Sequence, residues 1–537
     1  MKTSMKTRLS VIALAAALCG CAVGPKYEVP TAASPATFKE AEGWTPAAPA
    51  DALERGPWWT LFGDPVLDEL AAAIEVNNQN VALAAAQYAQ ARAVVAEQRA
   101  ALFPTVALNG SGNRSGGGGD TRPSNNYRVD IGGSWEPDIW GSLRAGVTGA
   151  QASAQASAAD LAAARLSAQG ELVANYIGLR QADVERQIID TTVQGYERVL
   201  KITQNRVDAG VTARSDLLQA QTQLFTARAD LLTVIRQRAV YEHAIAVLLG
   251  KAPSEFTLAP APWRIVVPEV PLGVPSTLLQ RRPDIAAAER SVAIANENIG
   301  IARAAYFPSL NLSASYCYGN SQVGGLFSAS NSLWSLGLSA AQTIFDAGAI
   351  AARVEQTKAA RDAAIASYRQ TVLAAFADVE DQLAATRALA QQQDLRRQAS
   401  EAADQVEQQM ENRYRAGQVN YTEVVSAQVT ALSARRALIQ VQADRQTTAV
   451  ALIQSLGGGW HTDITAGNRR QAPGFLKCFR KTGDRHRVFW NVSRKPVPVT
   501  GFFSILPGLF INPRGTHLVQ KTRTAGRSAG RLRRRTR

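Results

Sequence analysis

The chain has little cysteine and little histidine, and neither residue type is grouped. Among its 537 residues are 4 cysteines, of which Cys19 and Cys21 lie near the N-terminus, so a disulfide framework is not expected. Of the 4 histidines only His243 precedes residue 461, and we expect it to be a packing or surface residue of a helix. Metal-ligand spacings, a phosphate loop and a nucleophile elbow are also missing. We therefore expect no enzyme, no catalytic residue, no metal and no cofactor.

Long hydrophobic runs are missing as well. The only leader-like run, Val11 to Leu18, follows Lys2, Lys6 and Arg8 and is too short for a membrane-spanning helix, so residues 1–20 are expected to be a secretory signal. The signal ends in a sequence that resembles the bacterial lipoprotein box, which makes Cys21 the candidate for lipidation. An ordinary cleaved signal with two incidental cysteines is the alternative. A chain that spans a membrane without apolar helices must do so as a β-barrel.

The excess of positive charge lies at the C-terminal end of the sequence. The formal net charge is +14, but residues 461–537 hold 18 Lys and Arg against Asp463 and Asp484, which leaves the rest of the chain at -2. Nucleic acid is therefore not an expected partner of the main body. The basic tail could bind anionic lipid or nucleic acid, or it could be a disordered addition or an aberrant gene terminus, and we expect it to be dispensable.

An internal duplication organises the body of the chain. Residues 206–228 recur as 413–435, and residues 99–111 recur as 303–315. Each copy runs from a helical segment through Phe-Pro into alternating strands and then into a long helical stretch. The length of these helices argues for one fold built twice.

The strand-like segments alternate between apolar and polar residues. Four strands are expected, at about 105–115, 126–137, 309–319 and 332–344. Strands of this length with one apolar face match the outer-membrane barrel pattern, although a pair of β-sandwich hairpins would alternate in the same way. Four strands cannot close a barrel, so copies of the chain must complete it.

The helical segments are longer than a globular domain requires. Residues 142–207 and 350–415 contain no proline, and each would extend on the order of 100 Å at about 1.5 Å per residue. A shorter helix is expected from about Leu67 to Leu102, ended by Pro104. The expected organisation is a signal peptide at 1–20, a lipidated strap at 21–65, a first repeat at 66–250, a Pro-rich linker at 251–283, a second repeat at 284–460 and the basic tail at 461–537.

Several short motifs together resemble the outer-membrane factor family of efflux and secretion systems, the TolC-like proteins, and within it the NodT-like lipoprotein branch. The resemblance covers about residues 18–460. It depends on Cys21-Ala-Val-Gly-Pro-Lys-Tyr, Trp58-Trp59-Thr-Leu-Phe62-Gly-Asp64-Pro65, Leu279-Gln-Arg281-Arg282-Pro283-Asp284, Phe345-Asp346-Ala-Gly348, both Arg-x-x-Ala-Gly turns and Leu456-Gly-Gly-Gly-Trp460.

This resemblance implies a mainly α fold with a membrane β-barrel part. Three chains would each give four strands to a 12-stranded β-barrel in the outer membrane of a Gram-negative bacterium, and long antiparallel helical hairpins would form a periplasmic α-barrel. The implied partners are a periplasmic adaptor protein, an inner-membrane pump and outer-membrane lipid. The adaptor would contact the helical tips, at Arg206, Ala209, Gly210, Arg413, Ala416 and Gly417.

The resemblance also implies an acidic ring that narrows the periplasmic aperture. The matching positions are Glu423 and Ser426, and the repeat counterpart of Glu423 is Asp216. Because only one of the two matching positions is acidic, the ring would be weaker here. Glu423 and Asp216 are equally explained as solvated charges near the start of a helix, where the helix dipole favours them.

The expected function is a passive exit duct, the outer-membrane channel of a tripartite efflux system for small toxic compounds or drugs. A structural lipoprotein that bridges periplasmic layers is one rival, and a solute porin is another. Strand alternation disfavours the first, and the predominance of helix disfavours the second. The exported compound cannot be read from the sequence, since drugs, metal ions, siderophores and oligosaccharides all fit it.

Overall fold

A computed structural model describes residues 22–32, 35, 37–40, 57–117, 123–268 and 282–458. All of them belong to one compact unit, Met1–Arg470. The expected lipidation site Cys21, the signal, residues 41–56 of the strap and the whole basic tail lie outside the described residues.

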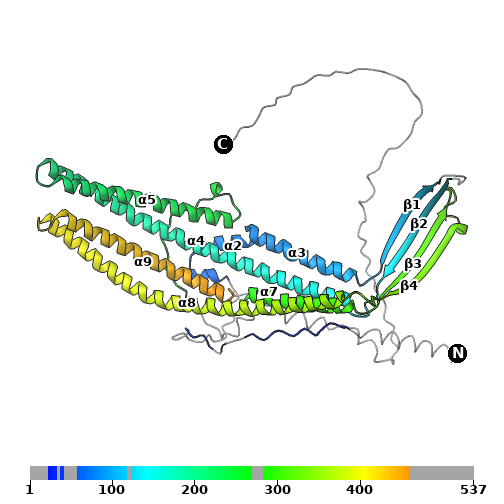
Figure 1. Cartoon of the computed structure of the whole chain (residues 1–537). Coiled ribbons are helices and arrows are strands. Elements are labelled where there is room, and N and C mark those ends of the chain that lie inside the picture. The colour runs from blue at the N-terminus through cyan, green and yellow to red at the C-terminus, as the bar shows by residue number, and fades with distance from the viewer. Residues whose placement is uncertain are drawn as a thin grey trace, which may run out of the picture. The chain divides into compact units, whose positions relative to one another are not determined.

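The duplication is visible in the lengths of the helices (Figure 1). The two longest helices, α4 and α8, have 67 residues each, and the helices that return from them, α5 and α9, have 35 each. The bounds are η1 Trp58–Phe62, α2 Pro65–Asn77, α3 Gln79–Ala100, β1 Thr105–Ser115, β2 Ser124–Trp135, α4 Ser142–Asp208, α5 Arg214–Leu248, η2 Pro253–Glu255, α7 Pro283–Ala304, β3 Ser309–Asn320, η4 Ala329–Asn331, β4 Ser332–Ala341, α8 Ala349–Arg415 and α9 Tyr421–Ser455.

The single helix expected from Leu67 to Leu102 is wrong, because the chain breaks at Asn78 into α2 and α3. The Asn78 side chain accepts hydrogen bonds from the backbone N–H groups of Asn80 and Val81 and so caps α3. Its Nδ2 donates to the carbonyl of Leu248, 2.8 Å away at the end of α5. The N-cap of α3 and the hydrogen bond to Leu248 together stabilise the break between α2 and α3, although the apolar residues keep their helical spacing through it.

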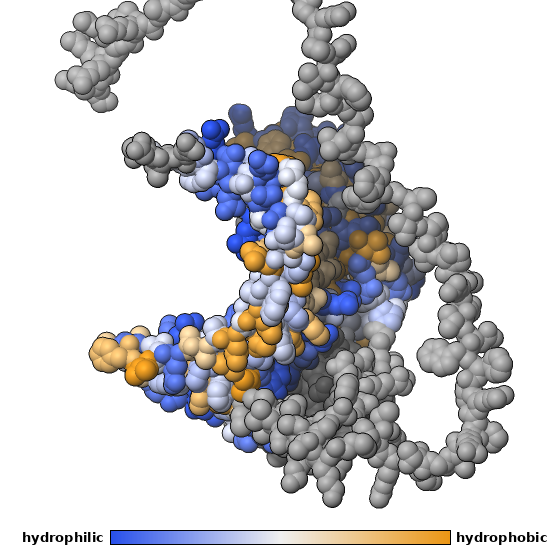
Figure 2. All heavy atoms as spheres, turned by 90° about the vertical axis from the view of Figure 1, so that its right-hand side faces the viewer, coloured by the Kyte–Doolittle hydropathy of each residue, from blue (hydrophilic) through white to orange (hydrophobic). Residues whose placement is uncertain are grey.

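The four strands form one antiparallel sheet in the order β1-β2-β3-β4. In the central pairing, Tyr127 lies opposite Asn320 and Trp135 opposite Leu312, which joins the two repeats. One face of the sheet carries Trp334 and Leu336, 78% and 76% exposed, so no other described part of the chain covers this apolar face. Among the described residues, β1 and β4 have no further partner strand. Figure 2 views the end at which the sheet lies, where the surface is hollowed on one side and hydrophobic side chains gather in patches.

Between residues 57 and 458, no helix that the structure describes is both long enough and apolar enough to cross a bilayer.

The helices pack through a core centred on α4, which lies beside α2, α3, α5, α7 and α9. Leu172, Leu179, Val372 and Leu383 in this core have no exposed surface. Burial of each such side chain stabilises the fold by about 1.5–3 kcal/mol. The long helices are therefore held by tertiary packing, which a lone helix of this composition would lack.

The strap and the linker lie along the helices through specific hydrogen bonds. In the strap, the Tyr27 hydroxyl donates to Glu289 of α7, and Asn296 Nδ2 donates to the carbonyl of Pro25 at 3.0 Å. In the linker, Arg180 Nη1 donates to the carbonyl of Ala259 at 2.9 Å, and Arg180 is itself only 2% exposed.

Candidate functional site at the helical tips

Each long helix ends in the same turn, at the end of the unit opposite the sheet (Figure 1). After α4, the N–H of Val211 donates to the carbonyl of Arg206 at 2.8 Å, and Gly210 has a φ of 72°. After α8, the N–H of Gln418 donates to the carbonyl of Arg413 at 2.9 Å, and Gly417 has a φ of 74°. Glycine is needed at both turns because a side chain strains this left-handed backbone conformation.

The helices that return from the two tips begin differently. Asn420 precedes α9, and its Oδ1 accepts the backbone N–H of Glu423 at 3.1 Å. Ala213 precedes α5 and offers no side-chain cap, but the Thr212 hydroxyl donates to Asp216 Oδ2 at 2.5 Å. The half-buried carboxylate of Asp216 accepts this hydrogen bond, whereas the Glu423 side chain is exposed. The two candidate aperture residues therefore differ in how far their carboxylates are exposed to solvent.

Aromatic and basic side chains connect the two tips. The guanidinium carbon of Arg206 lies 5.2 Å from the centre of the Tyr414 ring, close enough for a cation–π contact. The rings of Tyr414 and Tyr421 are 5.6 Å apart, and Tyr421 is 2% exposed. Burial raises the pKa of Tyr421, and the negative charge of nearby Asp216 raises it further. The phenol of Tyr421 is therefore neutral at physiological pH.

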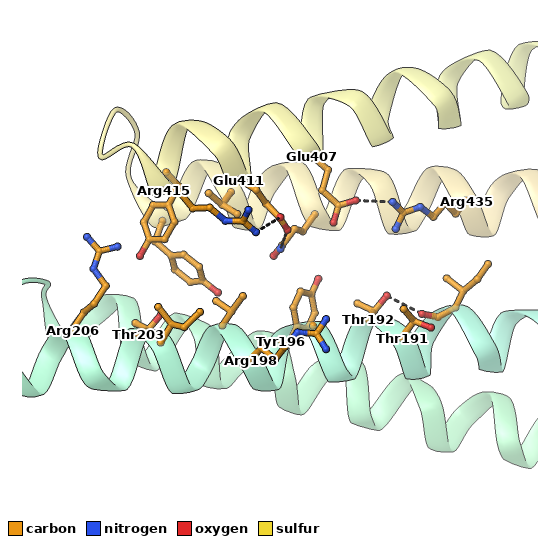
Figure 3. A pocket seen from close by; sticks show the side chains of 18 of the residues that line it. Thr191, Thr192, Tyr196, Arg198, Thr203, Arg206, Glu407, Glu411, Arg415 and Arg435 are labelled. Atoms are coloured by element: carbon orange, nitrogen blue, oxygen red, sulfur yellow. Dashed lines mark hydrogen bonds and ion pairs between the residues drawn. The ribbon is translucent and has the colours of Figure 1, made fainter.

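A cavity of about 1110 Å³ lies between α4, α8 and α9 next to these tips. Figure 3 shows Tyr196 of α4 pointing across it toward Glu407, whereas Arg206 points toward the end of α8 near Arg415. Its lining mixes apolar groups with side chains of both charges. The polar lining includes Tyr196, Thr203, Glu407, Glu411, Gln428 and Arg435.

Ion pairs lie on the α8 and α9 side of the cavity. Arg435 donates to Asp404 at 2.8 Å and to Glu407 at 2.7 Å. Burial raises the pKa of Glu407, and the charge of Arg435 offsets this only in part. Burial also raises the pKa of the facing Tyr196 to about 12, and the negative charge of Glu407 adds to that shift.

Three buried polar atoms of the lining have no hydrogen-bond partner among the described residues. They are Thr203 Oγ1, the Tyr414 hydroxyl oxygen and Gln428 Oε1. Buried polar groups of this kind are normally satisfied by water, and the cavity is large enough to hold it. The seam between the α4–α5 hairpin and the α8–α9 hairpin therefore combines buried polar groups with an apolar cluster at this level.

The structure places the predicted tip residues at the two turns, but it does not bring the two predicted aperture residues into contact by a hydrogen bond in the described part of the chain. Ala209, Gly210, Ala416 and Gly417 form the two turns, and Arg206 reaches the other tip through Tyr414. No hydrogen bond links Asp216 to Glu423 within the described part of the chain.

Sequence reasoning missed Tyr414, Tyr421, Glu407 and Arg435. One signal was available, because Arg435 is the repeat counterpart of Arg228. Arg228 makes the corresponding ion pair with Glu197 at 2.7 Å.

Comparison with known proteins places this geometry in a family. The family model for outer membrane efflux proteins matches residues 70–251 and 274–458. The chain belongs to this family of outer membrane efflux proteins.

The relatives of this efflux protein are similar over nearly their whole length. A probable efflux pump outer membrane protein of Pseudomonas putida, TtgC, is 33% identical over 87% of this chain and 98% of its own. The pyoverdine export outer membrane protein OpmQ of Pseudomonas aeruginosa is 31% identical over 86% and 98%. The solved outer-membrane channel OprN is 31% identical, with a TM-score of 0.75, and covers 82% of this chain and 100% of its own.

The family and these neighbours confirm the recognition, the fold class and the outer-membrane location expected from the sequence. The efflux protein is an outer-membrane channel component of a tripartite system, a homotrimer that acts with a periplasmic adaptor and an inner-membrane pump. Members of its family are channels rather than enzymes.

Proposed function

We propose that three copies of this chain form a passive exit duct for small toxic compounds or drugs, with no catalytic activity of its own. The energy for export comes from the inner-membrane pump, and the adaptor joins that pump to the duct. The relatives' names support export as the activity, since they include an efflux pump protein and a pyoverdine export protein.

One observation carries the proposal. In the part of the chain that the structure describes, a sheet with an uncovered apolar face and two unpaired edges is joined to hairpins made of a 67-residue helix and a 35-residue helix. An exposed apolar sheet edge is unstable in water and in lipid unless another copy pairs with it. A protein that only bridged periplasmic layers would need the helices but not this sheet.

The adaptor is proposed to contact the two helical tips. Arg206 and Arg413 stand at the ends of the long helices, next to the turns at Ala209-Gly210 and Ala416-Gly417. Basic and aromatic side chains lie next to the two glycine turns at the tips. This combination is suited to binding a helical hairpin of a partner protein.

The aperture is proposed to lie at Glu423, with Asp216 at the corresponding position of the first repeat. Three exposed Glu423 carboxylates around a threefold axis attract cations and repel one another, which favours cations in the entrance. Asp216 is hydrogen-bonded by Thr212, so Glu423 is expected to dominate this effect.

Cys21 is proposed to carry the lipid anchor. Its neighbour Val23 donates its N–H to the carbonyl of Trp140 at 3.2 Å, between the sheet and α4. An anchor on Cys21 would therefore leave the chain beside the proposed membrane boundary.

The test is a deletion of the gene followed by complementation. The deletion strain is expected to accumulate a fluorescent efflux substrate and to become sensitive to a panel of toxic compounds, and the wild-type gene is expected to restore both. A Gly417→Pro variant that is exported but fails to restore efflux would support a role for the tip. Unchanged accumulation and sensitivity for every compound tested would refute the exit-duct function.

A further inference from the structure

The cavity beside the helical tips is large enough for an organic molecule. We call it the tip cavity and define it by the faces of α4, α8 and α9 that line it. Its volume of about 1110 Å³ matches the upper end of the range of small-molecule sites, which is about 300–1,000 Å³. A few water molecules, at about 30 Å³ each, fill only a small part of this space. The tip cavity therefore admits a ligand as well as water.

Side chains at helical spacing form each wall of the tip cavity. On α4, Tyr196, Val199, Thr203 and Arg206 follow one another by three, four and three residues, so they share one face of the helix. The other two walls consist of Glu407, Glu411 and Tyr414 on α8 and of Tyr421, Val424 and Gln428 on α9. Figure 3 shows the helices of the two hairpins on either side of the cavity. Both repeats of a single chain thus build the site.

Thr203 differs from other threonines of the α4 wall. Thr191 and Thr192 also line the cavity, but their hydroxyls donate to the carbonyls of Gln187 and Ile188, at 2.9 Å each. Thr203 is 1% exposed, and its hydroxyl has no hydrogen-bond partner among the described residues. A buried hydroxyl that its own helix does not use costs free energy unless a bound group pairs with it.

Two polar atoms of α8 and α9 are in the same situation. Gln428 is 6% exposed, and its Nε2 donates to Glu411 at 3.3 Å, whereas its Oε1 has no partner in the described part of the chain. The Tyr414 hydroxyl has no described partner either. The cavity thus offers hydroxyl donors on α4 and α8 and an acceptor on α9. A matching ligand carries both an acceptor and a donor.

The unpaired charge of the lining is positive. Both carboxylates of the lining are matched by an arginine: Glu407 by Arg435 at 2.7 Å and Glu411 by Arg415 at 3.4 Å. Arg198 and Arg206 also line the cavity, and neither makes an ion pair with a described residue. An unpaired guanidinium binds a carboxylate through strong, charge-assisted hydrogen bonds. The acceptor of the ligand is therefore expected to be an anion.

Tyrosine rings make the tip cavity suitable for a flat ligand. The rings of Tyr414 and Tyr421 lie 5.6 Å apart, and the guanidinium carbon of Arg206 lies 5.2 Å from the centre of the Tyr414 ring. An aromatic wall and an unpaired cation are thus neighbours. Burial raises the pKa of Tyr196 to about 12, so this phenol is uncharged at physiological pH and does not repel an anion.

We propose that the tip cavity binds a small aromatic carboxylate that also carries a hydroxyl group. The carboxylate pairs with Arg206 and accepts from the Thr203 hydroxyl, which lies three residues earlier on the same face of α4. The ring lies against the tyrosines, and the ligand hydroxyl donates to Gln428 Oε1. This site goes beyond the exit duct, because residues of one chain line it and binding needs neither the pump nor the adaptor.

The test is equilibrium dialysis of radiolabelled 4-hydroxyphenylacetate against the purified full-length protein in detergent, with detergent alone as the blank. Saturable binding is expected. Phenylacetate, which lacks the hydroxyl, should compete about fivefold more weakly. The uncharged 4-hydroxyphenylacetamide should compete about tenfold more weakly, and the cation tyramine should not compete.

Two threonine variants form a matched pair. Thr203→Val should weaken binding of 4-hydroxyphenylacetate about fivefold, because it removes the unused donor. Thr192→Val should leave the affinity unchanged, because that hydroxyl is bonded within its own helix. Each variant is compared with wild type by helical circular dichroism and by its trimer mass. If Thr203→Val fails to fold, the analogue series and the Arg206 variant decide.

Arg206→Gln tests the anion directly. It should weaken binding of 4-hydroxyphenylacetate about tenfold and leave the affinity for 4-hydroxyphenylacetamide unchanged. Hydrogen exchange locates the ligand: peptides that contain residues 196–206 and 411–428 should exchange more slowly with 4-hydroxyphenylacetate, whereas peptides of α3 should not change.

Several results would overturn the site. They are the absence of saturable binding below about 10 mM, tyramine that competes as well as the carboxylate, equal losses in the two threonine variants, and protection confined to other peptides. Binding that persists although the gene deletion leaves efflux unchanged would refute the exit duct and not this site.

Discussion

Glu407 is a carboxylate that the tip cavity holds in an unfavourable environment. Burial raises its pKa above the ordinary value of 4.5 more than Arg435 lowers it. A native state with the raised pKa holds the proton more tightly than the unfolded chain does. The stability from Glu407 is therefore complete below its ordinary pKa and is lost as the pH rises through the raised native pKa.

A Glu407→Gln substitution should consequently raise the melting temperature near pH 7.5, and the gain should shrink toward zero near pH 4.5. Arg435 keeps Asp404 as a partner at 2.8 Å, so the substitution does not leave its charge unpaired. The measurement is thermal unfolding of the detergent-extracted protein, followed by helical circular dichroism at both pH values. A lower melting temperature than wild type near pH 7.5 would contradict the assignment.

At Gly250 any other residue would be strained. It has a φ of 67°, and a Cβ there would lie 2.4 Å from the carbonyl oxygen of Asn77. Gly250→Ala should cost about 1–3 kcal/mol, since both the backbone and the contact are strained.

The matched substitution is Gly195→Ala in the middle of α4, where a Cβ meets nothing within 4 Å. It should be neutral or stabilise the helix by up to about 1 kcal/mol. Denaturant unfolding should therefore show Gly250→Ala to be less stable than wild type and Gly195→Ala to be at least as stable as wild type. A Gly250→Ala protein as stable as Gly195→Ala would show that the close approach to Asn77 does not matter.

At the scale of elements, the two returning helices differ in their caps. Asn420 caps α9 with its side chain, whereas Ala213 cannot cap α5. Removal of a side-chain cap typically costs about 1 kcal/mol, which corresponds to roughly fivefold faster local opening.

Asn420→Ala should accelerate hydrogen exchange of the peptide that contains residues 413–430 by about fivefold, and Ala213→Asn should slow exchange of residues 206–223. Mass spectrometry of exchanged peptides measures both, with the sheet peptides as an internal reference. Unchanged exchange at the second tip in Asn420→Ala would mean that contacts between the hairpins, and not the cap, hold α9 in place.

At the scale of the whole molecule, the basic tail is expected to contribute nothing to assembly. Its charge of +16 exceeds the net charge of +14 of the whole chain, and the family match ends at residue 458. A chain truncated after Trp460 should still be exported, form trimers and restore efflux in the deletion strain. Loss of trimers in the truncated chain, at a normal level of protein, would contradict this expectation.

The sequence was sufficient for the periodic features of the fold and for its family. The alternation at Trp334, Leu336 and Leu338 predicts a strand with one apolar face, and the structure has that strand in β4. The Ala-Gly turns predict the ends of the long helices because glycine at a helix terminus acts locally.

Features that depend on distant contacts could not be predicted in this way. The break at Asn78 is fixed by Leu248, 170 positions away, and the cation–π contact of Arg206 with Tyr414 exists only because two repeats pack side by side. The predicted aperture residues Glu423 and Asp216 have the same helix position but different neighbours, which the repeat alone does not reveal.

The most direct test of the central claim is native mass spectrometry of the mature protein extracted from outer membranes in mild detergent. The account predicts a complex with three times the mass of the lipidated chain and no stable monomer, because the described part of a single chain leaves two sheet edges unpaired and one apolar face of the sheet exposed. A stable, folded monomer as the main species would contradict it.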